Sequence, residues 1–344
     1  MSTREKHFSA ALLNNQIQKN MCTRILYKTG YESYMVGRTM DWNDPAIPVS
    51  FYVFPRGYQQ NGGAGKNPIE WTSRYGSLII SGYEAGTNEG FNEKGLVVNT
   101  LYLAESDYGN EEERGKPTIS VGAWAQYVLD NFATVQEAVE ALAEDPFTIV
   151  SPVLPNGRQA SLHLSVSDPS GDSAIFEFIE GKIVISHSKD YTVMTNSPTF
   201  DQQLAIDAYW KTVGGTKFLP GTINAADRFA RASFNLSASP QYKTKPLALA
   251  SVWSQVRAIS TPLGLEDPDH PNISMTVWRS VLDQQDLVYY FENPLMESMI
   301  SLDLKKIDFR EGSGVRKLAT GQDMQMKGDV TGFLKPSEAF HFMS

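Results

Sequence analysis

Residues 21–42 read MCTRILYKTGYESYMVGRTMDW, and this stretch decides the fold. The apolar runs CTRILY and YMVGRTMDW flank the segment KTGYES, where Gly30 marks a turn, so the stretch predicts two strands joined in a hairpin. Cys22 opens the first strand and directly follows Met21. Residues 1–21 are polar and have no strong period. We expect them to be a leader or pro-segment that is removed, unless Met21 is the true start, and residues 22–344 to form a single domain.

Blocks of strands and blocks of helices follow one another along the rest of the chain. Strands are predicted within 75–84, 94–103, 162–188 and 273–304, where turn-like segments such as DPSGD and EGK separate the apolar runs. Helices are predicted at 120–132, 134–142, 200–210, 225–234 and 246–259, the second of them opening with a capping box from Thr134 to Glu137. Segregated hairpins, rather than βαβ alternation, favour antiparallel sheets covered by helices.

The composition makes several kinds of partner and site improbable on physical grounds. The 344-residue chain has a net charge of −9, so we expect neither nucleic acid nor a membrane as a partner. Its one cysteine cannot form an internal disulfide or a cysteine-based zinc site, and its five histidines are scattered, so we expect no metal and no cofactor. The N-terminal segment lacks the apolar core of a signal peptide. We therefore expect a cytoplasmic protein, or a periplasmic one if the native leader has been replaced.

Cys22 is the residue whose position indicates chemistry. By base rate a lone cysteine is a small buried hydrophobe, and that alternative stays open here. If the chain began at Cys22, its α-amine, with a pKa of about 7.7–8, would accept the proton of the thiol, and one residue would supply nucleophile and base. Such a site needs no histidine. It needs a cation that favours the thiolate, a carboxylate that orients the amine, and hydrogen-bond donors for an oxyanion.

Five short motifs make the chain resemble the choloylglycine hydrolases, the family of bile salt hydrolases and penicillin V acylases, which are N-terminal-nucleophile amidases. The resemblance covers essentially everything from Cys22 onward. Each motif alone is weak, but their order and the cysteine after a cleavable Met make the set specific. In chain order the motifs are Met21-Cys22-Thr23-Arg24, Gly37-Arg38-Thr39-Met40-Asp41-Trp42, NEKGL at 92–96 running on to Leu101-Tyr102, Thr195-Asn196-Ser197-Pro198, and Asp227-Arg228-Phe229.

The resemblance implies roles for three residues of the first hairpin. Cys22 is similar to the nucleophile, Arg38 to the cation beside the thiol, and Asp41 to the carboxylate that holds the α-amine and thiol. Arg38 and Asp41 are three residues apart, so a regular strand would place them on opposite faces. We therefore expect the strand to end or bulge between them.

The remaining motifs imply the oxyanion site. Asn196 resembles the side-chain donor to the oxyanion, and Tyr102 matches the position that supplies a backbone N–H to it. Arg228 resembles a further cation near Cys22. Trp42 and Trp71 are aromatic residues of the neighbouring segments, and we expect them to bind substrate.

The fold that the resemblance implies is α+β, a four-layer αββα sandwich in which two antiparallel sheets lie between helix layers. The implied reaction is hydrolysis of linear amide bonds in small N-acyl compounds through an acyl-thioester, as in penicillin V acylases. Conjugated bile salts and N-acyl homoserine lactones stay open as alternative substrates. A protein of another class, a silent binding protein left unprocessed on the same scaffold, also stays open. The short separation of Asn196 and Arg228 resembles the Gram-negative branch of the family, and we expect a homo-oligomer, either dimer or tetramer.

Overall fold

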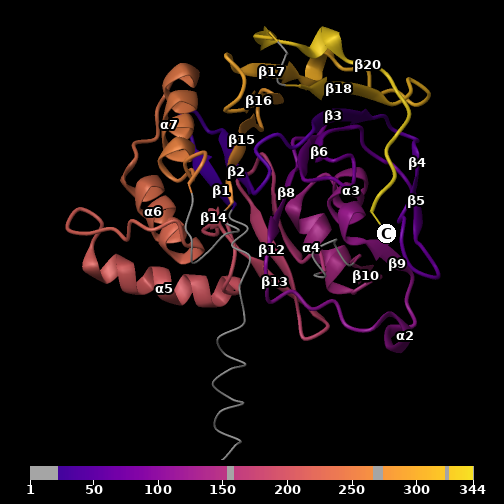
Figure 1. The fold of residues 1–344 in the computed structure, drawn as a ribbon, viewed down its shortest axis with the longest axis horizontal. Helices are drawn as coiled ribbons and strands as arrows, with labels where there is room; N and C mark the ends of the chain where they lie inside the picture. The colour runs from indigo at the N-terminus through magenta and orange to yellow at the C-terminus, as the bar shows by residue number, and fades with distance from the viewer. Residues whose placement is uncertain (1–21, 153–158, 266–273, 322–324, 344) are drawn as a thin grey trace, which may run out of the picture.

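Two large β-sheets lie face to face at the centre of the protein, and helices cover the outer face of each sheet (Figure 1). The computed structural model describes residues 22–152, 159–265, 274–321 and 325–343. The arrangement of two sheets between two helix layers confirms the predicted four-layer α+β sandwich. Residues 1–21 lie outside the described residues, so their removal stays a prediction.

The smaller sheet bears Cys22, which directly precedes the second strand in its spatial order. It has seven strands, and neighbouring strands pair antiparallel except β17 and β19, which run parallel. The hairpin predicted for residues 22–42 is confirmed as β1 and β2. In spatial order the strands are β14 (Val193–Met194), β1 (Thr23–Lys28), β2 (Tyr34–Trp42), β15 (Met275–Asp283), β16 (Val288–Glu292), β17 (Ile300–Asp303) and β19 (Gly328–Asp329).

The larger sheet has nine strands, all paired antiparallel. Its spatial order is β13 (Lys182–His187), β12 (Ser173–Ile179), β11 (Leu162–Ser167), β8 (Val97–Tyr102), β7 (Glu89–Asn92), β6 (Ser77–Gly82), β3 (Val49–Phe54), β18 (Arg316–Thr320) and β20 (Lys335–Pro336). Two small strand pairs lie apart from it: the antiparallel β4 (Gln59–Asn61) and β5 (Glu70–Thr72), and the parallel β9 (Thr118–Ser120) and β10 (Thr148–Val150).

The helices divide between the two outer faces. The larger sheet is covered by α3 (Val121–Asn131) and α4 (Val135–Ala143). The smaller sheet is covered by α6 (Ala225–Ala238) and α7 (Lys245–Ala258), with α5 (Phe200–Val213) packed on α6. Short helical turns complete the fold: α2 (Glu111–Arg114), η1 (Leu304–Lys306) and η2 (Thr331–Phe333). Within the described ranges, no helix is long and apolar enough to cross a bilayer.

Two separate cores follow from this layering. Between the sheets, Phe51 of β3 lies edge-on to Tyr289 and Phe291 of β16, with ring centroids 5.2 and 5.3 Å apart. Beneath α3, Trp124 and Val128 are fully buried against the other face of the larger sheet, as the helical spacing predicts. The central strands β3 and β6 are therefore buried along their whole length, whereas the edge strands β13 and β20 are exposed or half-buried.

Candidate active site

Cys22 lies at the N-terminal end of β1, and only 3% of it is exposed. Its backbone N–H donates to Asn196 Oδ1 at 2.7 Å, and its sulfur lies 3.6 Å from the sulfur of Met40. Burial raises the pKa of the Cys22 thiol, while the positive charges of Arg38 and Arg228 oppose that rise. Burial outweighs these cations, so the net pKa of the thiol lies above its ordinary value, and a nearby base is needed to form the thiolate.

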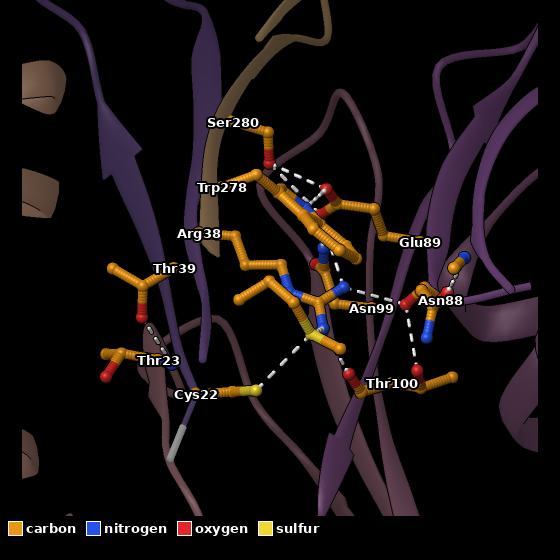
Figure 2. A network of polar contacts seen from close by, with 12 residues as sticks. Cys22, Thr23, Arg38, Thr39, Asn88, Glu89, Asn99, Thr100, Trp278 and Ser280 are labelled. Atoms are coloured by element: carbon orange, nitrogen blue, oxygen red, sulfur yellow. Dashed lines mark hydrogen bonds and ion pairs between the residues drawn. The ribbon is translucent and has the colours of Figure 1, made fainter. Parts of the chain in front are cut away.

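Arg38 extends from β2 towards the larger sheet and is held there by backbone carbonyls (Figure 2). Its Nη1 donates to the Asn88 carbonyl and its Nη2 to the Thr100 carbonyl, both at 2.7 Å. Its Nη2 also lies 3.0 Å from the sulfur of Met40. Burial lowers the pKa of Arg38, but the Glu89 carboxylate raises it, and the net pKa lies above the ordinary value. Arg38 is therefore a fixed cation at this buried position.

Asp41 is a fully buried carboxyl on the same strand. The Thr276 hydroxyl donates to its Oδ1 at 2.6 Å, whereas Oδ2 has no hydrogen-bond partner among the described residues. Burial raises the pKa of Asp41 to about 6, although the Arg228 charge acts in the opposite direction. One oxygen of this carboxyl thus remains ready to accept a further hydrogen bond.

Arg38 and Asp41 lie on opposite faces of β2, as their spacing requires. The expectation that the strand ends or bulges between them was wrong, because β2 is continuous from Tyr34 to Trp42. Both residues act on Cys22 because it lies at a strand end. The Arg38 charge and the backbone N–H of Asp41 favour the thiolate of Cys22, whereas the Asp41 carboxylate opposes it.

The irregularity lies in the neighbouring strand β15. Thr276 pairs with Asp41 and Trp278 pairs with Met40, so Val277 is an extra, unpaired residue. This β-bulge turns Thr276 to the face of Asp41, whereas Trp278 shares the opposite face with Met40.

Asn196 connects the nucleophile with the neighbouring loop and helix. Its Oδ1 accepts from the Cys22 N–H and from Arg228 Nη2, at 2.7 and 2.8 Å, and its Nδ2 donates to the Tyr102 carbonyl at 2.8 Å. Two donors on one oxygen fix which way the amide points. Gln203 of α5 holds the backbone here by donating to the Asn196 carbonyl at 3.0 Å.

Arg228 of α6 is fully buried beside the nucleophile. Its Nη1 donates to the Cys22 carbonyl at 2.6 Å and to the Thr23 hydroxyl, and its Nε donates to the Ile223 carbonyl at 2.9 Å. Burial lowers the pKa of Arg228. Six predicted residues are thus brought together by the fold: Cys22, Arg38, Asp41, Tyr102, Asn196 and Arg228.

The two predicted substrate-binding tryptophans have different surroundings. Trp42 ends β2, is half-buried, and packs against the core cluster that includes Cys22. Trp71 instead packs in the core beneath α3, where its Nε1 donates to the Asp130 carboxyl at 2.8 Å. Trp71 is therefore a core residue, and its predicted place at the substrate was wrong. In the described part of the chain, no cluster of His, Cys, Asp and Glu is arranged to hold a metal ion.

Comparison with known proteins assigns the family. The model of the linear amide C–N hydrolases, choloylglycine hydrolase family, matches residues 22–315. The chain belongs to the choloylglycine hydrolase family. It is an amidohydrolase of linear amides, and the resemblance of the five motifs is confirmed.

Relatives of this chain carry two kinds of name. The penicillin V acylase of Pectobacterium atrosepticum is 46% identical, over 93% of this chain and 92% of that protein. The bile salt hydrolase/transferase of Clostridium perfringens is 25% identical, over 83% of this chain and 93% of that protein. The solved structure of penicillin V acylase from Agrobacterium tumefaciens is 46% identical, covers 94% of this chain and 100% of that one, and superposes with a TM-score of 0.87.

Sequence reasoning missed two buried residues around the site of this hydrolase. Glu89 forms an ion pair with Arg38, with 3.4 Å between Oε2 and Nη1. His163 lies behind the oxyanion segment: its Nε2 is 2.9 Å from the Thr195 carbonyl and its Nδ1 is 3.0 Å from Glu177. Both contacts join residues far apart in the chain, so no local spacing signals them.

Proposed function

We propose that Cys22 is the N-terminal nucleophile of this hydrolase, in a chain from which residues 1–21 have been removed. The observation that carries the proposal is the hydrogen bonding of Asn196, whose one side chain contacts the nitrogen of Cys22, the cation of Arg228 and the backbone of Tyr102. The family match also begins at Cys22. A free α-amine at this nitrogen would supply the base that the site otherwise lacks.

The reaction starts with transfer of the thiol proton of Cys22 to its own α-amine. The thiolate attacks the amide carbonyl, and the tetrahedral oxyanion accepts hydrogen bonds from the Asn196 side chain and the Tyr102 backbone N–H. The α-ammonium returns its proton to the leaving amine as the C–N bond breaks. Water then attacks the acyl-thioester, which releases the acid and restores the thiol.

Charged neighbours prepare the nucleophile for this cycle. Arg38 and Arg228 favour the thiolate of Cys22, because an opposite charge favours the charged form of a buried group. Asp41 holds the α-ammonium, and this role is supported by its Oδ2, which has no hydrogen-bond partner in the described part of the chain. The half-buried Trp42 next to Asp41 is proposed to contact the acyl group.

The first test is the mass of the protein and of its adduct. We expect the intact mass to correspond to a chain that begins at Cys22, and rapid quenching with penicillin V to add one phenoxyacetyl group to Cys22. If the protein is instead a silent binding protein, the chain retains residues 1–21 and forms no adduct. Amide hydrolysis by protein whose mass still includes residues 1–21 would contradict the proposal.

The second test concerns the substrate, for which we propose a phenoxyacetyl or medium-chain acyl amide. The two penicillin V acylases, each 46% identical, support this choice, and the bile salt hydrolase relatives support the alternative. With penicillin V and glycocholate competing in one assay, we expect the higher kcat/KM for penicillin V. Preference for glycocholate would assign the enzyme to conjugated bile salts. N-acyl homoserine lactones, as a third competitor, test the remaining alternative.

We further propose a single domain over residues 22–344 and a homo-oligomer in the cytoplasm, or in the periplasm if the native leader has been replaced. Fractionation of the source cells and the mass of the native particle in solution test these two points separately from the chemistry.

A further inference from the structure

Glu89, the first residue of β7, is a carboxylate that the reaction above does not use. It is fully buried, yet polar hydrogens of several side chains point at it. Its Oε2 accepts from Asn99 Nδ2 at 2.8 Å and lies 3.4 Å from Arg38 Nη1. Its Oε1 accepts from Trp278 Nε1 at 3.1 Å and from Ser280 Oγ at 2.9 Å (Figure 2). It also accepts from the Tyr289 hydroxyl of the same sheet.

The hydrogen bonds to Glu89 stabilise its buried ion pair with Arg38. A buried charge persists only where it is paired and hydrogen-bonded, and removal of one partner leaves the other uncompensated. Of the described residues, Glu89 is the carboxylate that forms an ion pair with Arg38. Since both side chains are fully buried, solvent screens this pair little.

Figure 2 shows Arg38 with Cys22 on one side and Glu89 on the other. The cation attracts a thiolate at Cys22, and the carboxylate behind the cation opposes that attraction. Two other charged groups face Cys22: Asp41, which shares β2 with Arg38, and Arg228 from α6. The electrostatic potential at the Cys22 sulfur therefore depends on Glu89 as well as on Arg38.

We propose that Glu89 is a positioning residue for amide hydrolysis, which fixes Arg38 and offsets part of the positive charge that Arg38 presents to Cys22. The inference rests on the proposed roles of Cys22 and Arg38. It gives the buried network of Glu89 a function in catalysis, separate from its contribution to folding.

Glu89→Gln tests this with a side chain of nearly the same volume. The amide oxygen still accepts from Trp278, Ser280 and Tyr289, while the negative charge is lost. Asn99 Oδ1 has no hydrogen-bond partner among the described residues, so Asn99 is able to turn and accept from the new amide. The variant thus removes one charge and leaves the hydrogen bonds nearly complete.

The readout is the pH at which iodoacetamide alkylates Cys22 at half its maximal rate. Removing a negative charge near a thiolate stabilises it, so Glu89→Gln is expected to move this midpoint to lower pH, together with the acidic limb of kcat/KM. Arg38→Gln is expected to move both to higher pH. Loosened packing without an electrostatic role predicts slower alkylation at every pH and no shift to lower pH.

A matched control is Glu93→Gln. Glu93 lies four residues after Glu89, directly after the end of β7, and forms an ion pair with the half-exposed Arg56. The substitution makes the same chemical change in an ion pair of the surface and is expected to leave the midpoint unchanged. Stability gives a second readout: adding Arg38→Met to Glu89→Gln is expected to raise Tm above that of Glu89→Gln alone, because the unpaired cation is gone.

The outcomes distinguish the role of Glu89 from the role of Arg38. If Arg38→Gln shifts the midpoint and Glu89→Gln leaves it in place or raises it, the role of Glu89 is refuted and the role of Arg38 stands. If Arg38→Gln leaves the midpoint unchanged, the proposed role of Arg38 as the cation that favours the Cys22 thiolate is refuted. Should Glu89→Gln not fold, Tyr289→Phe keeps both charges and removes one donor from Glu89. It is expected to move the midpoint to higher pH, and an unchanged midpoint there overturns the inference.

Discussion

Asn196→Ala is expected to lower kcat by roughly 10²–10³, about 2.7–4 kcal/mol of transition-state stabilisation, with little change in KM. The Nδ2 group carries two hydrogens, and the Tyr102 carbonyl accepts one of them. The other is the proposed donor to the oxyanion, where charge develops only during the reaction. Steady-state kinetics with penicillin V measure the loss.

Asn196→Ala is also expected to lower Tm, because the side chain is buried and makes three hydrogen bonds. Asn92→Ala is the matched control: Asn92 is fully buried, and its Nδ2 donates to the Leu129 and Phe132 carbonyls beneath α3. We expect the control to lose stability and keep its kcat. A destabilised Asn196→Ala with normal kcat would reduce Asn196 to a structural residue.

Asp41→Asn is expected to have opposite effects on activity and stability. Loss of the carboxylate that holds the α-ammonium removes a proton-transfer contribution, so kcat is expected to fall by roughly 10²–10⁴. At the same time the variant is expected to melt at a higher temperature than the wild type at about pH 8. Kinetics on the chain that begins at Cys22, and thermal unfolding of the chain that retains residues 1–21, measure the two effects.

The sign of the stability effect follows from the pKa of Asp41, which burial raises from 3.8 to about 6. The folded state therefore binds this proton more tightly than the unfolded state. The resulting stability is present below pH 3.8 and is lost as the pH rises through about 6. Above that pH the buried charge costs about 3 kcal/mol, and Asn removes the cost. We expect the gain in Tm to shrink when the pH is lowered to about 5.

Asp130→Asn is the matched control for this prediction. Asp130 is another fully buried carboxyl, and burial raises its pKa to about 7, but it lies in α3 beside Trp71. Its replacement is expected to give the same kind of pH-dependent change in Tm with kcat retained. Full activity in Asp41→Asn would remove the carboxylate from the mechanism.

Local patterns predicted most of the fold. The hairpin of residues 22–42, the helix around Trp124 and the capping box at Thr134 each depend on residues within a few positions of one another. The Glu137 N–H does bond to the Thr134 hydroxyl, at 3.2 Å. The relative placement of the two sheets depends on contacts between distant residues, and only the resemblance to a family made it predictable.

The site was predictable where a motif carried it and unpredictable elsewhere. Trp71 belongs to an aromatic-rich segment, but its indole N–H is satisfied by Asp130, which lies far along the chain. Glu89 lies between the strands predicted at 75–84 and 94–103, and its sequence context does not indicate that the fold brings Arg38 beside it. For both residues, the deciding partner is chosen by tertiary packing, about which sequence periodicity carries no information.

The extra residue Val277 reverses which face of β15 the side chains after it point to. On one side of it, Thr276 touches the carboxylate that faces the helices; on the other side, Trp278 and Ser280 touch the carboxylate between the sheets. A strand without the insertion would present all three side chains to the same face. Because of it, the acidity of Asp41 and the environment of Glu89 are tuned by different residues of one strand. An engineer is therefore able to redesign either environment while the other is left as it stands.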